Sequence, residues 1–433
     1  MAEKLQDIAN YTLEALKKAG ADKASVNVES GKKDEFNIEA NEFTLLRTLF
    51  ESTLRIKTLV GGRKGVAVIN KLDKDSINEA VENCISLAKI AEPDEAEDIA
   101  PLEENKHFSQ TIGGADNTAL FKRTKEYLEQ VRDEFPKINI EAFSSDFDSK
   151  NSVYVNSNGV CHTSNVENYY YSSTFVGKDG EKSSSFNYTG ESLANLNSPF
   201  LNPHHRRMLE DSVKSLDTRM IEGKFTGKII VAPTCPDMIW YTLLFNFIGS
   251  GCLLEGTSRW KDALDTEVAN KILTMRSVPL DSQIIAGERV TSDGFISKNN
   301  DFIVDGVLKS FALDLYAANK LGKPRAANTA HYNMEVVAGN TSLEDMIKGI
   351  DKGVLLNRFS GGSPGASGDI SGVAKNSFLI ENGKITDALQ ETMISFNIVD
   401  ALKNITDISK ERICDGSSIL PWCTFDGITV SGK

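Results

Sequence analysis

Apolar and polar residues alternate with clear periods in the first part of the chain. From Leu5 to Ala19, apolar residues recur mostly every three or four positions, which predicts an amphipathic helix that ends at Gly20. A glycine-rich turn at 61–65 leads into the apolar run 66–69, and this arrangement is typical of a β-hairpin. Period-two runs at 24–28 and 36–40 each predict a strand, and so do the strand-like runs at 44–50 and 53–60.

Two more amphipathic helices are predicted from capping residues and apolar spacing. One begins near Asp73 or Asp75, and the next runs from Asp116 to about Phe135, where Pro136 ends it. Strand signals resume after the third helix, at 138–143, 153–155 and 169–171.

An acid-rich stretch, 91–105, separates the second and third predicted helices. It contains Pro93 and Pro101 and carries many Asp and Glu residues. We expect it to be a solvated connector, because runs of like charge and prolines are typical of exposed segments.

The second half of the chain has a different pattern. A short apolar strand at 228–232 precedes a helix, 238–248, whose apolar residues surround the whole axis, and such a helix is expected in a core. From about Val278 the pattern is mostly β with glycine turns, interrupted by a short helix at 343–350. The fold class is therefore predicted as α+β, with an N-terminal helix and antiparallel-strand domain over 1–222 and a β-rich C-terminal domain over 223–433.

Charge and cysteine usage narrow the function classes. Lys and Arg number 48 against 61 Asp and Glu, and the resulting net charge of −13 opposes non-specific nucleic-acid binding. The six cysteines are scattered without close pairs, which indicates free thiols in a reducing compartment. The longest apolar segment, 238–248, is well short of the roughly 20 residues of a membrane span, and acids occupy the place of a signal sequence. We expect a cytoplasmic protein that does not bind membranes.

Motifs for self-sufficient hydrolysis are weak. None of the five histidines is paired at the i, i+4 spacing of a zinc hydrolase, and no metal site or cofactor is predicted. The run 361–365 matches G-x-S-x-G around Ser363, but no helix start of the expected kind follows it. We instead predict a turning loop whose backbone approaches a peptide or a partner. Its candidate contact residues are Gly362, Gly365, Gly368 and Asp369.

Several segments, in order, resemble the TldD/PmbA family over nearly the whole chain. The resemblance rests on the turn at 59–67, Asn156-Ser157-Asn158-Gly159-Val160, residues 306–310, Ser367-Gly368-Asp369-Ile370-Ser371, residues 378–385 and the final strand 420–432. Family members are described as metallopeptidases or their inactivated partners, and some carry the label modulator of DNA gyrase. The net charge gives that label no support as direct DNA binding.

The resemblance also implies what the site lacks. The TldD-like branch carries His-Glu-x-x-x-His on a buried helix, and in this chain those positions align with Phe245, Asn246 and Ser250. A phenyl ring cannot bind zinc, an amide cannot act as the general base, and a neutral hydroxyl is a poor substitute for imidazole. The resemblance therefore places the chain in the PmbA branch, also called TldE.

Three hypotheses follow. The first is a pseudo-peptidase subunit that dimerises through its C-terminal half, with a TldD-type zinc metallopeptidase as partner or as a homodimer, and that takes part in peptide processing. The second is a peptidase that acts alone through an unrecognised site, with Cys414 or His331 as candidates. The third is a homodimeric peptide-binding protein.

Overall fold

Two β-sheets, one from each half of the chain, make up most of the molecule. The structure is a computed structural model that describes residues 2–362 and 364–432. Within those residues the first sheet has eight strands and the second has fourteen. Helices pack on both sheets, which confirms the predicted α+β class.

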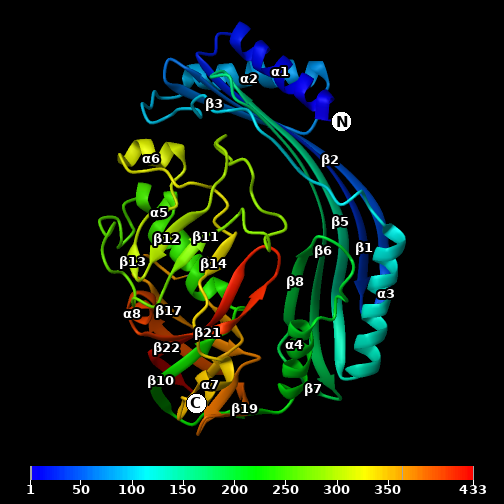
Figure 1. The fold of residues 1–433 in the computed structure, drawn as a ribbon, viewed down its shortest axis with the longest axis vertical. Coiled ribbons are helices and arrows are strands. Elements are labelled where there is room, and N and C mark those ends of the chain that lie inside the picture. The colour runs from blue at the N-terminus through cyan, green and yellow to red at the C-terminus, as the bar shows by residue number, and fades with distance from the viewer. Residues whose placement is uncertain (1, 363, 433) are drawn as a thin grey trace.

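Long strands form the first sheet, in the order β3-β2-β1-β5-β6-β4, with β7 and β8 also paired to β6. The long strands curve into an arc, and the second half of the chain lies on the inner side of that arc (Figure 1). The strands are β1 (Lys23–Glu39), β2 (Glu42–Val60), β3 (Arg63–Ile69), β4 (His107–Gln110), β5 (Ile138–Asn156), β6 (Cys161–Asp179), β7 (Lys182–Ser183) and β8 (Asn187–Leu193).

The prediction of separate short strands was wrong for β1 and β2, because each pair of predicted strands is one long strand. The face of β1 that carries Val28 and Phe36 also carries Ser30, Lys32 and Asp34 between them. Val28 packs in the apolar cluster of the first two helices, and Phe36 packs in a second cluster farther along. The polar residues lie between these clusters and interrupt the alternation in the sequence.

Four helices cover the first sheet. They are α1 (Ala2–Lys18), α2 (Lys74–Ile90), α3 (Asn117–Glu134) and α4 (Pro203–Lys214). The predicted caps are confirmed, because the Asp73 carboxylate accepts a hydrogen bond from the backbone of Ser76 and Asp116 accepts one from Ala119. Each buried Leu, Ile or Val side chain under these helices contributes about 1.5–3 kcal/mol.

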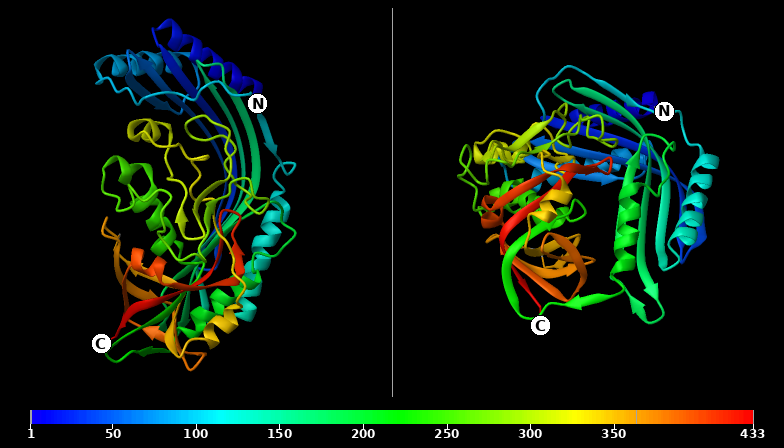
Figure 2. Two further views of the ribbon diagram at one scale, coloured as in Figure 1. Left: turned by 60° about the vertical axis from the view of Figure 1, so that its left-hand side comes forward. Right: turned by 60° about the horizontal axis from the view of Figure 1, so that its bottom comes forward.

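The second sheet is organised around β22, which pairs with β10, β14, β20 and β21. Figure 2 shows this half of the molecule from two further sides. Its strands are β9 (Thr218–Met220), β10 (Lys224–Val231), β11 (Met275–Ser277), β12 (Asn300–Val304), β13 (Val307–Leu308), β14 (Met334–Val336), β15 (Lys352–Leu356), β16 (Arg358–Gly361), β17 (Asp369–Lys375), β18 (Phe378–Glu381), β19 (Lys384–Gln390), β20 (Thr392–Asn397), β21 (Ile405–Cys414) and β22 (Ile419–Ser431).

Short helices accompany this sheet. They are the π-helical turns η1 (Asp237–Tyr241) and η2 (Leu244–Ile248), and the α-helices α5 (Ser250–Leu254), α6 (Leu315–Leu321), α7 (Leu343–Lys348) and α8 (Ile398–Lys403). The domain division at 222–223 stays a prediction, and β9, which precedes it, already pairs with β19 of the second sheet. Within the described residues, no helix is both long and apolar enough to cross a membrane.

The acidic connector 91–105 is only partly the solvated segment that its composition predicts, because its middle, 96–100, is mostly buried and its ends are mostly exposed. Glu97 is buried, and its carboxylate pairs with Lys57 at 2.8 Å and also with Lys64. Asp94 pairs with Lys320 of α6 at 2.9 Å. The prediction was wrong for this middle part, because Glu97 and Asp94 meet lysines from both halves of the molecule and hold it against the protein.

Candidate functional site

A cavity of about 1190 Å³ lies between the inner face of the first sheet and loops of the second half of the chain. The loops 286–293 and 314–316 contribute to its lining from the second half. Clefts between two structural units are preferred places for ligand sites. This cavity is therefore the main candidate site.

Strand alternation explains why the sheet presents polar side chains to the cavity. Along β1, Val26 and Val28 pack under the helices, whereas Ser25, Asn27 and Glu29 line the cavity. One face of the strand thus builds the core and the other builds the cavity wall.

The cavity wall carries charges of both signs. The Glu29 carboxylate lies 3.1 Å from the Lys150 ammonium and 3.7 Å from the Arg55 guanidinium. Close by, the Asp146 carboxylate lies 3.0 Å from the Lys33 ammonium. Burial raises the pKa of Asp146 to about 6, although Lys33 opposes the shift. Mixed charges of this kind suit a polar chain better than a polyanion.

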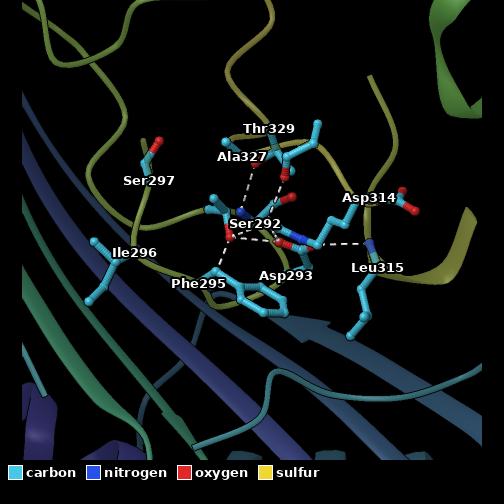
Figure 3. Close-up of polar contacts among 12 residues, drawn as sticks. Ser292, Asp293, Phe295, Ile296, Ser297, Asp314, Leu315, Ala327 and Thr329 are labelled. Atoms are coloured by element: carbon cyan, nitrogen blue, oxygen red, sulfur yellow. Dashed lines mark hydrogen bonds and ion pairs between the residues drawn. The ribbon is translucent and has the colours of Figure 1, made fainter. Parts of the chain in front are cut away.

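A loop between β11 and β12 forms one side of the cavity and is held by Asp293 (Figure 3). The Asp293 carboxylate accepts hydrogen bonds from the backbone N–H of Leu315 and from Nε of Arg325, each at 2.8 Å. The Arg325 guanidinium lies 3.9 Å from the centre of the Phe295 ring. Burial alone would raise the pKa of Asp293, but the bonds from Arg325 outweigh burial, so its pKa is lowered.

The same loop contacts the first sheet directly. At Gly294 the backbone has φ +93°, and a Cβ atom there would lie 2.0 Å from Cζ of Tyr154 on β5. Glu103 accepts a hydrogen bond from the backbone N–H of Ile296 at 3.0 Å, and its carboxylate lies 3.8 Å from Nε2 of His162. Burial lowers the pKa of His162 despite this carboxylate. The loop therefore joins the two halves of the molecule beside the cavity.

The helix predicted as buried over 238–248 is mostly buried. It consists of η1 and η2, and Phe245 is 56% exposed. The Phe245 ring lies 6.0 Å from that of Tyr332, and the Tyr332 ring lies 5.2 Å from that of Tyr241. The predicted core position is therefore confirmed for most of the helix, whereas Phe245 joins Tyr332 and Tyr241 in an aromatic cluster at the surface.

The other two aligned positions make hydrogen bonds within the protein. The Asn246 amide nitrogen donates to the carbonyl of Pro364 at 2.8 Å. The Ser250 hydroxyl donates to the carbonyl of Ala312 at 3.4 Å and accepts from the backbone N–H of Asp314 at 3.2 Å. Because Asp314 lines the cavity, this end of the helix reaches the candidate site.

The glycine-rich loop lies against the same helix. Gly362 and Gly365 are exposed, whereas Gly368 is buried with φ +80°, and a Cβ there would lie 2.9 Å from the Phe247 ring. Asp369 is exposed and accepts a hydrogen bond from Asn397, which lowers its pKa. The structure thus brings this loop and the 245–250 segment together. Ser363, the centre of the G-x-S-x-G match, lies outside the described residues.

The side chains at 245, 246 and 250 do not fit a zinc ion. Phe245 has no lone pair, the Asn246 amide is bound to Pro364, and the Ser250 hydroxyl bridges two backbone groups. Within residues 2–362 and 364–432, no group of three or more His, Cys, Asp or Glu side chains is placed to hold a metal ion.

Cys414 and His331 lack the environment of a catalytic pair. The Cys414 thiol donates to the carbonyl of Gln283 at 3.4 Å, and burial raises its pKa, which favours the unreactive thiol. The His331 ring packs against Phe302 at 6.1 Å, and burial lowers its pKa.

Sequence reasoning did not identify the residues that build the cavity. The polar residues of β1 that line the cavity could have been predicted, because they alternate with the apolar residues that were recognised as a strand. No pattern in the neighbouring sequence marks Asp293, Arg325 or Glu103 as site residues. Each of them bonds to a residue that is distant along the chain, and Glu103 bonds to a residue in the other half of the molecule.

Comparisons with known proteins agree with this architecture. Residues 224–432 match the family model described as PmbA/TldA metallopeptidase C-terminal domain. The chain is 22% identical to the metalloprotease PmbA of Escherichia coli O157:H7, over 86% of this chain and 85% of that protein. It is 23% identical to a metalloprotease PmbA homolog of Haemophilus influenzae, over 100% of this chain and 97% of that protein.

A solved structure shows the same fold over the whole length. TldE from Thermococcus kodakarensis superposes with a TM-score of 0.84 at 18% identity, covering 98% of this chain and 100% of that chain. The C-terminal family match and the full-length relatives, together with the shared fold, support membership of the TldD/PmbA family of metallopeptidase-related proteins.

Proposed function

We propose that this chain is a non-catalytic subunit in peptide processing, of the PmbA or TldE kind. It pairs with a TldD-type zinc metallopeptidase, with a second copy of itself, or with both. Its own contribution is to hold an extended peptide in the cavity between its two halves and to supply part of the wall around the substrate.

The main support for the proposal is the chemistry and bonding of the side chains of Phe245, Asn246 and Ser250. A zinc peptidase needs imidazole or carboxylate ligands and a carboxylate base. At the positions that the resemblance aligns with the His-Glu-x-x-x-His motif, this chain has an exposed phenyl ring, an amide bound to Pro364 and a hydroxyl bound to Ala312 and Asp314. These bonds give the amide and the hydroxyl structural roles in place of chemical ones.

The cavity supports the second part of the proposal. Its wall offers amides, hydroxyls and charges of both signs, which match the backbone groups and mixed side chains of a peptide. An extended peptide exposes hydrogen-bonding groups along its whole length, so a long polar wall suits it.

The test compares zinc content and peptide cleavage for three samples: this chain, a TldD-type zinc peptidase and their mixture. We expect the dialysed chain to contain less than one zinc per ten molecules and to cleave no peptide. We expect the mixture to cleave unstructured peptides at least several-fold faster than the peptidase alone. Stoichiometric zinc in this chain, or a mixture no faster than the peptidase, contradicts the proposal.

A charge reversal tests the role of the cavity. Glu29→Lys removes the carboxylate that faces Lys150 and Arg55 and places three cations together, so we expect the stimulation by this chain to fall several-fold. Glu181→Lys is the matched control, because Glu181 is exposed in the turn before β7 and does not line the cavity. Equal stimulation by both variants would exclude the cavity as the peptide site.

A further inference from the structure

The outer edge of β2 is open over its first half. Strand β3 pairs only with residues 54–60 of β2. Within the described part of the chain, no strand pairs with the outer side of residues 42–53. This segment contains neither lysine nor proline, which commonly protect edge strands. Its unpaired N–H and C=O groups are a template for another strand.

Large apolar side chains are exposed along the same edge. Phe50 is 76% exposed and Leu46 is 65% exposed, and Phe43 and Leu45 are each 39% exposed. Phe121 of α3 lies beside Phe43, with ring centres 5.0 Å apart, and is itself 43% exposed. Contiguous apolar groups on a surface mark sites of interaction with another protein or a membrane.

Charges on the edge favour a second copy of this chain as the occupant. Arg47, Leu49 and Glu51 alternate on one face of β2. If two β2 strands pair antiparallel with Leu49 opposite Leu49, Arg47 of each copy lies opposite Glu51 of the other. In the single chain Nε of Arg47 already donates to Glu35 at 2.7 Å, which leaves its terminal nitrogens for a second carboxylate. Glu51 is exposed, so its carboxylate is accessible to the Arg47 guanidinium of a second copy.

In the same register, the apolar side chains on the opposite face of β2 also meet those of the second copy. Phe50 then lies opposite Thr48 of the second copy and diagonal to its Leu46 and Phe50, within reach of an aromatic ring. The two most exposed apolar side chains of the edge therefore become buried together.

We propose that residues 45–53 of β2, within this open edge, pair antiparallel with the same segment of a second copy, so that one sheet continues across a two-fold dimer. Leu49 and Glu51 also line the cavity, so the second copy closes its outer end. This inference rests on the homodimer that the proposed function allows, and it places the interface on β2 of the N-terminal half and not on the C-terminal half that the first hypothesis names. Its test measures association alone, so it succeeds or fails independently of peptide cleavage.

A single cysteine tests the register. Residue 49 is opposite itself, so Leu49→Cys places two Cα atoms about 4.5–5.5 Å apart, which is within disulfide reach. We expect the oxidised full-length variant to form a covalent dimer. Leu45→Cys is the matched control, because residue 45 lies opposite Thr53 and its two copies are about 26 Å apart. The unsubstituted chain controls for cross-links through its own six cysteines.

A charge exchange tests the contacts. Glu51→Arg places an arginine opposite Arg47 of the other copy, and the two-fold symmetry repeats this repulsion once more. We therefore expect the dimer Kd, measured by sedimentation equilibrium, to rise at least tenfold. The double variant Arg47→Glu with Glu51→Arg restores opposite charges, and we expect the Kd to recover most of that loss. Glu42→Arg, at the end of the open edge and outside this register, leaves the Kd unchanged.

Three results would overturn the inference. They are a wild-type chain that stays monomeric at high micromolar concentrations, a dimer that Glu51→Arg leaves intact, and a dimer that Leu49→Cys does not cross-link. Edge variants that self-associate normally but no longer bind a zinc-bearing homologue would assign the edge to that partner and would also overturn it.

Discussion

One buried histidine makes the stability of the first half of the chain depend on pH. His205 is fully buried among aromatic rings, with Tyr127 at 5.2 Å and Phe175 at 5.5 Å between ring centres. Burial lowers its pKa to about 3. The local sequence does not mark this position as buried, because the contacts of His205 are with rings distant along the chain and its neighbours His204 and Arg206 are polar.

The sign of the pH effect follows from that lowered pKa. The unfolded chain binds a proton on His205 below about pH 6.5, whereas the folded chain stays neutral there, so stability falls as pH drops from about 6.5 towards 3. The cost is about 1.4 kcal/mol per pH unit. We expect His205→Phe to reduce the slope of unfolding free energy against pH by this amount, measured by urea unfolding between pH 4.5 and 6. The exposed His107→Phe control should keep the wild-type slope.

At the scale of elements, the sequence predicts helices well and strands less well. Helix starts at Asp73 and Asp116 depend on local capping chemistry, which is visible in the sequence. The length of β1 depends on which helices cover it, and its central residues Lys32 and Asp34 face a gap between two apolar clusters. Local pattern therefore predicts where an element begins more reliably than how far it extends.

The acidic connector supports a prediction at this scale. Glu97 is buried between Lys57 and Lys64, so Glu97→Ala leaves two lysines without their partner. We expect a loss of about 1–3 kcal/mol in the free energy of unfolding, measured by urea denaturation. Glu95→Ala is the matched control, because Glu95 is exposed in the same connector, and we expect it to change stability by less than about 0.5 kcal/mol. Equal effects of the two changes would mean that the connector is not held by this cluster.

At the scale of the whole molecule, the candidate site depends on how the two halves meet. Phe245, Asn246 and Ser250 were named as candidate residues from the family resemblance. The glycine-rich loop was named from its composition. The sequence did not predict the cavity, because the inner face of the first sheet and the loop around Asp293 come from segments more than one hundred residues apart. Such a site depends on sheet curvature and long-range contact, which periodicity does not encode.

The two halves are in close contact at Gly294. Its φ of +93° suits glycine, and a Cβ there would lie 2.0 Å from Cζ of Tyr154. We expect Gly294→Ala to separate the loop from the first sheet, because a clash with a packed ring cannot be relieved in place. The expected results are a lower melting temperature and faster proteolysis of the loop 286–297. Gly114→Ala is a close control, because Gly114 has φ +90° and no atom lies within 4 Å of the place that a Cβ would take, so it carries the backbone strain alone. If both variants lose the same stability, strain accounts for the effect and the Tyr154 contact does not hold the halves together.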